Sequence, residues 1–205
     1  AAGRLREVQD AYDGRVVIAY KVFPLAESPD MLSQMFGDPV AAKAEILSHW
    51  ESARRYARMQ GDDVPIQVEL MQSRPFPYPY SLPSLMAVKA AEFQGGMPAH
   101  ERYYNRAQWA HLVECRNVAD RETLIDLARD CELDLDRFLA DFESDRARDA
   151  VLADRQAALE MGISGTPTVV FDDKWVLSGA VPASHYRQIV DDLLAGREPR
   201  RQRRG

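Results

Sequence analysis

The proline at position 167 constrains the fold of this chain more than any other residue. It stands directly before the β-rich run 168–171, and because a proline cannot donate a hydrogen bond into a sheet, it belongs at a strand's first residue or at an edge. Gly162 and Gly165 precede it and supply backbone angles that other residues avoid. A cis Thr166-Pro167 bond suits such a tight connection, and an ordinary trans strand start is the alternative. If the bond is cis, the Thr166 backbone becomes a sheet edge that an extended peptide or a thiol substrate can join.

The segment after this proline predicts a hairpin and a closing helix. Asp172-Asp173 connects the run 168–171 to a second β-rich run at 174–177, and Ser178-Gly179 ends that second strand. Residues 182–194 then repeat apolar side chains at helical spacing. A helix, a loop with a proline, a hairpin and a helix follow one another here in the order of the C-terminal half of a thioredoxin fold.

The middle of the chain, from about residue 38 to residue 145, predicts a block of helices. Aspartates that begin helical patterns are good N-caps, and these are Asp38, Asp120, and Asp134 or Asp136. The helix from Asp38 is expected to stop at Gly61-Asp62-Asp63, and a later helix from about residue 145 at Gly162. The proline-rich segment 73–83 cannot be helical and favours extended chain. We interpret it as a loop over the edge of a cleft, with a ligand for a proline-reading domain as the alternative.

The first residues predict a short α/β segment. Residues 5–12 have the pattern of a helix end, and Asp13-Gly14 that of a turn. The run 15–23 is rich in β-branched and aromatic residues and has no polar alternation at 16–18, which predicts an interior strand covered on both faces. Because the chain starts with neither an initiator Met nor a signal-peptide pattern, we expect it to be processed or a fragment.

Composition and charge exclude some classes of protein. An apolar share of 46% and a charged share of 28% indicate a globular chain, and without a run of 18 apolar residues we expect no membrane span. The tail 197–205 holds five arginines and one glutamate, so it carries +4 and the rest of the chain carries −10 within the net −6. We expect a solvated, disordered tail, and an acidic body is a poor binder of nucleic acid.

The cysteines and histidines form no recognisable metal or redox motif. Cys115 and Cys131 are too far apart for a CxxC pair or half of a zinc site, so we expect buried apolar thiols. The four histidines, at positions 49, 100, 111 and 185, include no HExxH or close pair. We therefore expect no metal site and histidines that are hydrogen-bonded or solvent-facing.

The sequence from Gly162 to Ala180 resembles the cis-proline loop, hairpin and closing helix of the DsbA-like family, especially its FrnE-type branch. The resemblance extends to residues 13–25, 84–92 and 112–136, in the same order along the chain. It implies an α/β, thioredoxin-like fold with a large helical insertion (DsbA-like). The expected divisions are an N-terminal thioredoxin half at 1–37, a helical insertion at 38–145, a C-terminal thioredoxin half at 146–196 and the basic tail at 197–205.

The resemblance also implies an activity, thiol–disulfide exchange by a protein-disulfide oxidoreductase. The family's nucleophile lies in a CxxC, or a serine-bearing variant of it, between the first strand and the first helix. Residue 1 resembles a position already inside that helix, so we expect the motif upstream of residue 1 and no catalytic residue in this chain. Gly165, Thr166 and Pro167 are then the residues that bind the substrate.

The expected partner is a thiol- or disulfide-bearing substrate, such as an extended peptide, and no cofactor, nucleic acid or membrane. The oligomeric state stays open, with a homodimer as one option. The sparse cysteines and the resemblance to the cytosolic FrnE-type branch indicate a cytoplasmic location.

Two other functions are compatible with the same fold. A glutathione-dependent isomerase or kappa-type transferase shares it, with glutathione bound, but that branch is expected to carry a Ser-Asp clamp where this chain has Gly179-Ala180-Val181. The other is a non-catalytic binding module that has lost its thiol.

Overall fold

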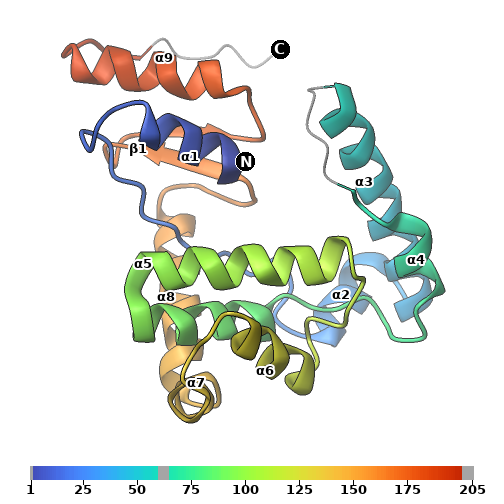
Figure 1. Ribbon diagram of the computed structural model, residues 1–205. Coiled ribbons are helices and arrows are strands. Elements are labelled where there is room, and N and C mark those ends of the chain that lie inside the picture. The colour runs from blue at the N-terminus through green and yellow to red at the C-terminus, as the bar shows by residue number, and fades with distance from the viewer. Residues whose placement is uncertain (1, 60–64, 200–205) are drawn as a thin grey trace. The chain divides into compact units, whose positions relative to one another are not determined.

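The computed structural model describes residues 2–59 and 65–199, and the chain forms two compact units (Figure 1). One unit comprises residues 20–157, and the other comprises the residues up to 19 together with those from 158 onward. The predicted helix stop at Gly61-Asp62-Asp63 and the basic tail from Arg200 onward lie outside the described residues. Within the described part, no helix has the length and apolar character needed to cross a membrane.

The unit of residues 20–157 is helical. Its elements are α2 (Pro29–Phe36), α3 (Pro39–Met59), α4 (Val68–Ser73), α5 (Leu82–Leu112), α6 (Arg121–Asp130), α7 (Leu135–Phe142) and most of α8 (Asp145–Glu160). Helix α5 packs against α6 and α7, as Figure 1 shows, and the fully buried Tyr103, Leu124 and Phe138 form the centre of this contact. Burial of these large side chains is the main source of the unit's stability.

The aspartate caps predicted from the sequence are confirmed. Asp38 Oδ1 accepts hydrogen bonds from the N–H groups of Val40 and Ala41 at the start of α3. Asp120 accepts from Thr123 at 2.9 Å, and Asp134, one of the two alternatives considered for α7, accepts from Arg137 at 3.0 Å. Each carboxylate satisfies backbone donors that have no partner within the helix.

A second apolar cluster lies where α3 and α4 meet the turn after α5. Leu47, Trp50, Val68, Met71 and Cys115 are its buried members. The proline-rich segment is non-helical from Arg74 to Ser81, as predicted, but the prediction is wrong at its two ends. Ser73 is the last residue of α4, and Pro83 falls in the first turn of α5, where a proline is tolerated because its missing N–H would have no partner within the helix.

The other unit contains α1 (Ala2–Asp10), β1 (Thr168–Phe171), β2 (Trp175–Ser178) and α9 (Ala183–Leu194). The predicted hairpin is confirmed: β1 and β2 are antiparallel, with Val169 opposite Leu177. Asp172 and Asp173 turn the chain with φ of 50° and 53°, and the Lys174 N–H closes the turn on the Phe171 carbonyl. Lys174 therefore belongs to the turn, and the second strand begins one residue later than expected.

The core of this unit lies between the hairpin and the helices α1 and α9. Its buried members are Val8, Tyr12, Leu177, Tyr186 and Val190. Helix α1 packs against α9, where the Tyr12 hydroxyl donates to Asp191 at 2.7 Å.

The strand predicted at 15–23 is wrong. The segment from Val16 to Phe23 is irregular, and Val17 is 84% exposed, whereas an interior strand would bury it. A strand requires a neighbouring strand to bond with, and among the described residues only β1 and β2 form a ladder. Val22 is buried, but its N–H donates to the Asp154 carboxylate instead of to another strand.

Candidate functional site

The loop from Ile163 to Pro167 joins α8 to β1 and contains the predicted substrate-binding residues. The Thr166-Pro167 peptide bond is cis, which decides between the two alternatives that the sequence left open. Thr166 is exposed, and Gly165 and Pro167 are partly buried on either side of it.

Hydrogen bonds fix this loop at both ends. After α8, Gly162 has φ +74° and the Ile163 N–H donates to the Ala158 carbonyl at 2.9 Å, which ends the helix as the sequence predicted. At the hairpin, the Thr168 hydroxyl donates to the Gly165 carbonyl at 2.8 Å, and the Gly179 N–H donates to the Pro167 carbonyl at 2.8 Å. The loop therefore presents Thr166 to solvent from a fixed backbone.

Among the described residues, β1 is paired along one side. β1 pairs with β2 along one side, and no other described residue extends the ladder on the opposite side. An extended peptide can add to such an edge through main-chain hydrogen bonds. The loop residues Thr166 and Pro167 stand at the beginning of this edge.

The two cysteines are buried, as predicted, and neither can serve as an exposed nucleophile. Cys115 is 0% and Cys131 is 2% exposed. Burial raises the pKa of both thiols, which lowers the fraction of reactive thiolate. The Cys115 thiol also donates to the Gln67 carbonyl at 3.2 Å.

A buried ionic cluster was not anticipated from the sequence. Lys89 in α5 and Asp154 in α8 are 3% and 8% exposed, and the Lys89 Nζ lies 2.7 Å from Asp154 Oδ2. Glu92 accepts from Lys89 at 3.0 Å and binds His100 Nδ1 at 2.8 Å, and Lys21 contacts the other Asp154 oxygen at 3.0 Å. Each buried charge thus has an opposite charge beside it.

For Asp154 and Lys89, the ion pairs have a larger combined effect on the pKa than burial has. Burial alone would raise the pKa of Asp154, but hydrogen bonds from Lys89 and Lys21 hold it below its usual range. Burial likewise opposes the charge on Lys89, whose bonds to Asp154 and Glu92 nevertheless raise its pKa. The sequence feature that could have indicated this cluster is the lysine inside the apolar run 86–91. A charge in an apolar helix face is tolerated only when an opposite charge lies beside it.

Trp50, Tyr78 and His111 form a separate set of polar contacts within the helical unit. Tyr78 accepts a hydrogen bond from Trp50 Nε1 at 3.1 Å, and its hydroxyl lies 3.0 Å from His111 Nε2. Burial lowers the pKa of His111 to about 4, so this ring is neutral at physiological pH. Among the described residues, no group of three or more His, Cys, Asp or Glu side chains is placed to hold a metal ion.

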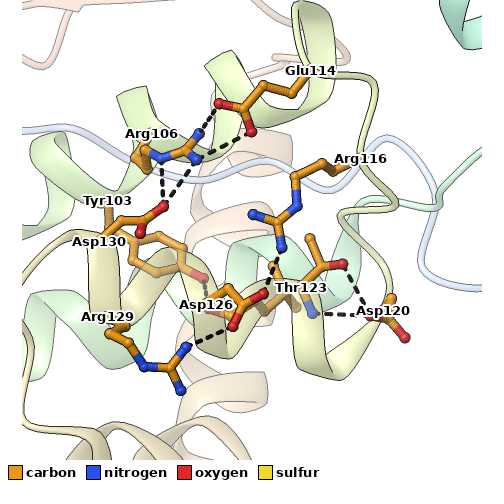
Figure 2. Close-up of polar contacts among 10 residues, drawn as sticks. Tyr103, Arg106, Glu114, Arg116, Asp120, Thr123, Asp126, Arg129 and Asp130 are labelled. Atoms are coloured by element: carbon orange, nitrogen blue, oxygen red, sulfur yellow. Dashed lines mark hydrogen bonds and ion pairs between the residues drawn. The ribbon is translucent and has the colours of Figure 1, made fainter.

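Figure 2 shows ion pairs that join α5 and the turn after it to α6. Arg106 bridges Glu114 and Asp130, and Asp126 binds two arginines, at 2.8 Å and 2.7 Å. These charges neutralise one another across neighbouring turns.

A helix, a fixed cis-proline loop, a hairpin and a closing helix together define a thioredoxin-like chain. Residues 7–181 match the family model described as thioredoxin, so the chain belongs to the thioredoxin family. The predicted α/β fold is confirmed, and it has the DsbA-like form, with many helices and a small sheet.

Solved structures share this fold. A candidate protein disulfide isomerase from Nitrosomonas europaea is 24% identical, with a TM-score of 0.71 over 95% of this chain and 90% of that one. The cytosolic disulfide reductase DsbM from Pseudomonas aeruginosa with GSH is 25% identical, with a TM-score of 0.57 over 73% of this chain and 76% of DsbM.

The curated relatives that match this chain are named as adapter proteins and not as oxidoreductases. The ClpXP adapter protein SpxH of Bacillus subtilis (strain 168) is 30% identical over 157 residues, which are 74% of this chain and 50% of SpxH. This chain thus spans about half the length of the curated relatives it matches.

Proposed function

We propose that this chain belongs to a thiol–disulfide oxidoreductase of the DsbA type, in which Gly165, Thr166 and Pro167 bind the substrate. The observation that carries the proposal is the loop before β1 in a member of the thioredoxin family. It exposes Thr166 at the start of β1, on a backbone that hydrogen bonds fix at both ends. A helical insertion of the FrnE type is part of the same proposal.

The chemistry is dithiol/disulfide exchange. A thiolate attacks one sulfur of the substrate disulfide, that S–S bond breaks, and a mixed disulfide forms as the other substrate sulfur leaves as a thiolate. A second thiol of the enzyme then displaces the first substrate sulfur and closes an enzyme disulfide. Because Cys115 and Cys131 are buried, the proposal assigns the attacking thiol to a motif outside residues 1–205.

Reduction of insulin by the complete natural protein, with dithiothreitol as the final reductant, tests this function. Thr166→Arg places a bulky charge at the exposed position and should lower kcat/KM for insulin about tenfold. Turnover of the small disulfide hydroxyethyl disulfide should change little, since it needs no strand edge. Gln188→Arg, at an exposed position of α9, is the matched control.

Two results would count against the proposal. Equal kcat/KM for insulin in Thr166→Arg and Gln188→Arg would show that the loop does not bind the substrate. Insulin reduction by residues 1–205 alone would contradict the assignment of the nucleophile to a motif outside them.

DsbM, which is described as cytosolic and was solved with GSH, supports a cytoplasmic location and the binding of glutathione. Replacing dithiothreitol by glutathione in the insulin assay tests the second point, and cell fractionation tests the first. Turnover of a glutathione conjugate or isomerisation substrate without insulin reduction would favour the glutathione-dependent alternative.

A second candidate is a ClpXP adapter, which the names of the curated relatives favour. Its test is binding of the complete protein to purified ClpX together with faster degradation of a bound client. Such binding without any insulin reduction would favour the adapter over the oxidoreductase.

A further inference from the structure

A groove lies between the first turns of α3 and the proline-rich segment after α4, within the unit of residues 20–157. Its volume is approximately 380 Å³, which is in the range of small ligand sites. Most of its lining is apolar, and the main contributors are Pro39, Val40, Ala44, Leu47, Phe76 and Pro77. We refer to it as the α3 groove.

Two cations also line the α3 groove. Lys43 Nζ donates to the carbonyl oxygens of Arg74 and Phe76, at 2.6 Å and 3.0 Å, and lies 5.3 Å from the centre of the Phe76 ring. Arg74 donates to the carbonyl oxygens of Cys115 and Glu114, at 3.0 Å and 2.8 Å. Carbonyl oxygens hold both side chains in place but do not neutralise their charge.

Neither cation forms an ion pair with a carboxylate of the described residues. Other basic side chains of this acidic protein do: Arg106 has two carboxylate partners, and Arg116 has one (Figure 2). Partial burial lowers the pKa of Lys43, because desolvation disfavours its charged form. A carboxylate in the groove would supply the missing charge.

We propose that the α3 groove binds a peptide segment of a partner protein that carries a carboxylate between apolar side chains. The apolar wall accepts the neighbouring side chains, and Val40, which is 78% exposed, extends this wall at the rim. Lys43 and Arg74 bind the carboxylate. The exposed amide of Gln72, also in the lining, can both donate hydrogen bonds to a peptide backbone and accept them from it. An alkyl carboxylate has no such backbone.

The test uses the complete chain and a panel of fluorescein-labelled hexapeptides in fluorescence anisotropy. Each peptide places one Glu, or a free C-terminal carboxylate, among Leu, Phe and Val. A matched panel has Gln in place of Glu and an amidated C-terminus. At least one acidic peptide should bind with a Kd below about 1 mM and lose at least fivefold in affinity as its neutral counterpart.

Ala44→Glu places a negative charge in the groove wall without removing any hydrogen bond, and it should weaken binding of the acidic peptide at least tenfold. Ala53→Glu makes the same substitution at an exposed position of α3 outside the groove, and it should bind within twofold of the unmodified chain. Lys43→Gln should weaken binding and flatten its dependence on salt, because the interaction with the carboxylate is ionic. Circular dichroism confirms that each variant is folded.

Several outcomes would overturn the proposal. These are no acidic peptide bound below 1 mM, equal affinity for the acidic and neutral panels, or binding to Ala44→Glu as strong as to Ala53→Glu. Competition by dodecanoate at a lower concentration than by the best peptide would identify the groove as a site for an alkyl carboxylate and would reject the peptide.

Discussion

At the scale of single residues, the buried charges of Lys89 and Asp154 are tolerated because each lies beside an opposite charge. Lys89 and Asp154 lie 2.7 Å apart in the helical unit, and both are almost fully buried. An unpaired charge in such a place is strongly destabilising, whereas a paired one is close to neutral against an apolar pair of similar size. The stability of this region therefore depends on pairing more than on the presence of charge.

Asp154→Asn should destabilise the protein by about 3 kcal/mol, because it leaves Lys89 buried without its nearest opposite charge. The double variant Lys89→Met with Asp154→Leu should be more stable than Asp154→Asn. Urea unfolding at pH 7 measures both. Asp126→Asn, at the exposed ion pairs of Figure 2, is the control and should change little. A double variant less stable than the single one would contradict the argument.

His111 should make stability depend on pH. Its pKa is about 4 in the folded protein and near 6.5 in the unfolded chain, so the unfolded chain binds the proton first as the pH falls. Above pH 6.5, the contribution of neutral His111 to the free energy of unfolding is complete. Between pH 6.5 and 4, roughly 3 kcal/mol of that free energy is lost. His111→Phe should remove this part of the loss in urea unfolding measured from pH 7.5 to 4.5. The exposed His49→Gln should retain it.

At the scale of elements, aspartate caps and glycines set where the helices begin, break and end. Helix α5 runs from Leu82 to Leu112 with a break at Gly95 and Gly96. Gly96 has φ +61° and ψ −155°, a conformation that is essentially confined to glycine. A Cβ on Gly95 would lie 2.8 Å from the Cβ of Ala99.

Gly96→Ala should destabilise the protein by about 1 to 3 kcal/mol, because alanine is strained in this conformation. Gly165→Ala is the matched control. The expectation of an unusual backbone angle holds for Gly162 and is wrong for Gly165, which does not have a positive φ; no atom lies within 4 Å of a Cβ added to Gly165. Thermal unfolding followed by circular dichroism compares the two. A larger loss for Gly165→Ala would show that the break in α5 is not the more constrained position.

At the scale of the whole molecule, the two units have separate cores. The clusters around Phe138 and around Trp50 contain only residues of the helical unit. The cluster around Tyr186 contains only residues of the unit with the hairpin. Each unit thus has its own source of stability, and local opening of one need not expose the core of the other.

Phe138→Ala should lower the free energy of unfolding of the helical unit by about 3 to 5 kcal/mol, because Phe138 of α7 is fully buried where α7 packs against α5. Hydrogen exchange measured by mass spectrometry should then show faster exchange in α5, α6 and α7. Exchange in β1, β2 and α9 should stay close to that of the unmodified chain. An equal increase throughout the chain would mean that the two units unfold as one.

The sequence by itself determined the features that depend on neighbouring residues. The caps at Asp38 and Asp120, the turn at Asp172-Asp173 and the end of α8 at Gly162 lie where local spacing predicted them. Backbone donors, turn angles and helical periodicity act over a few residues, so the pattern is complete within a short window. The thioredoxin fold followed from the order of these local elements.

Only the tertiary structure decided the features that depend on distant partners. The run 15–23 has the composition of a strand, yet its Val22 N–H bonds to Asp154, 132 positions away in the chain. The sequence also did not predict that Lys89 pairs with Asp154. Nor did it predict that Lys43 and Arg74 lie together in the α3 groove. A strand needs a ladder and a buried charge needs a counter-charge, and the fold as a whole determines which segments supply them.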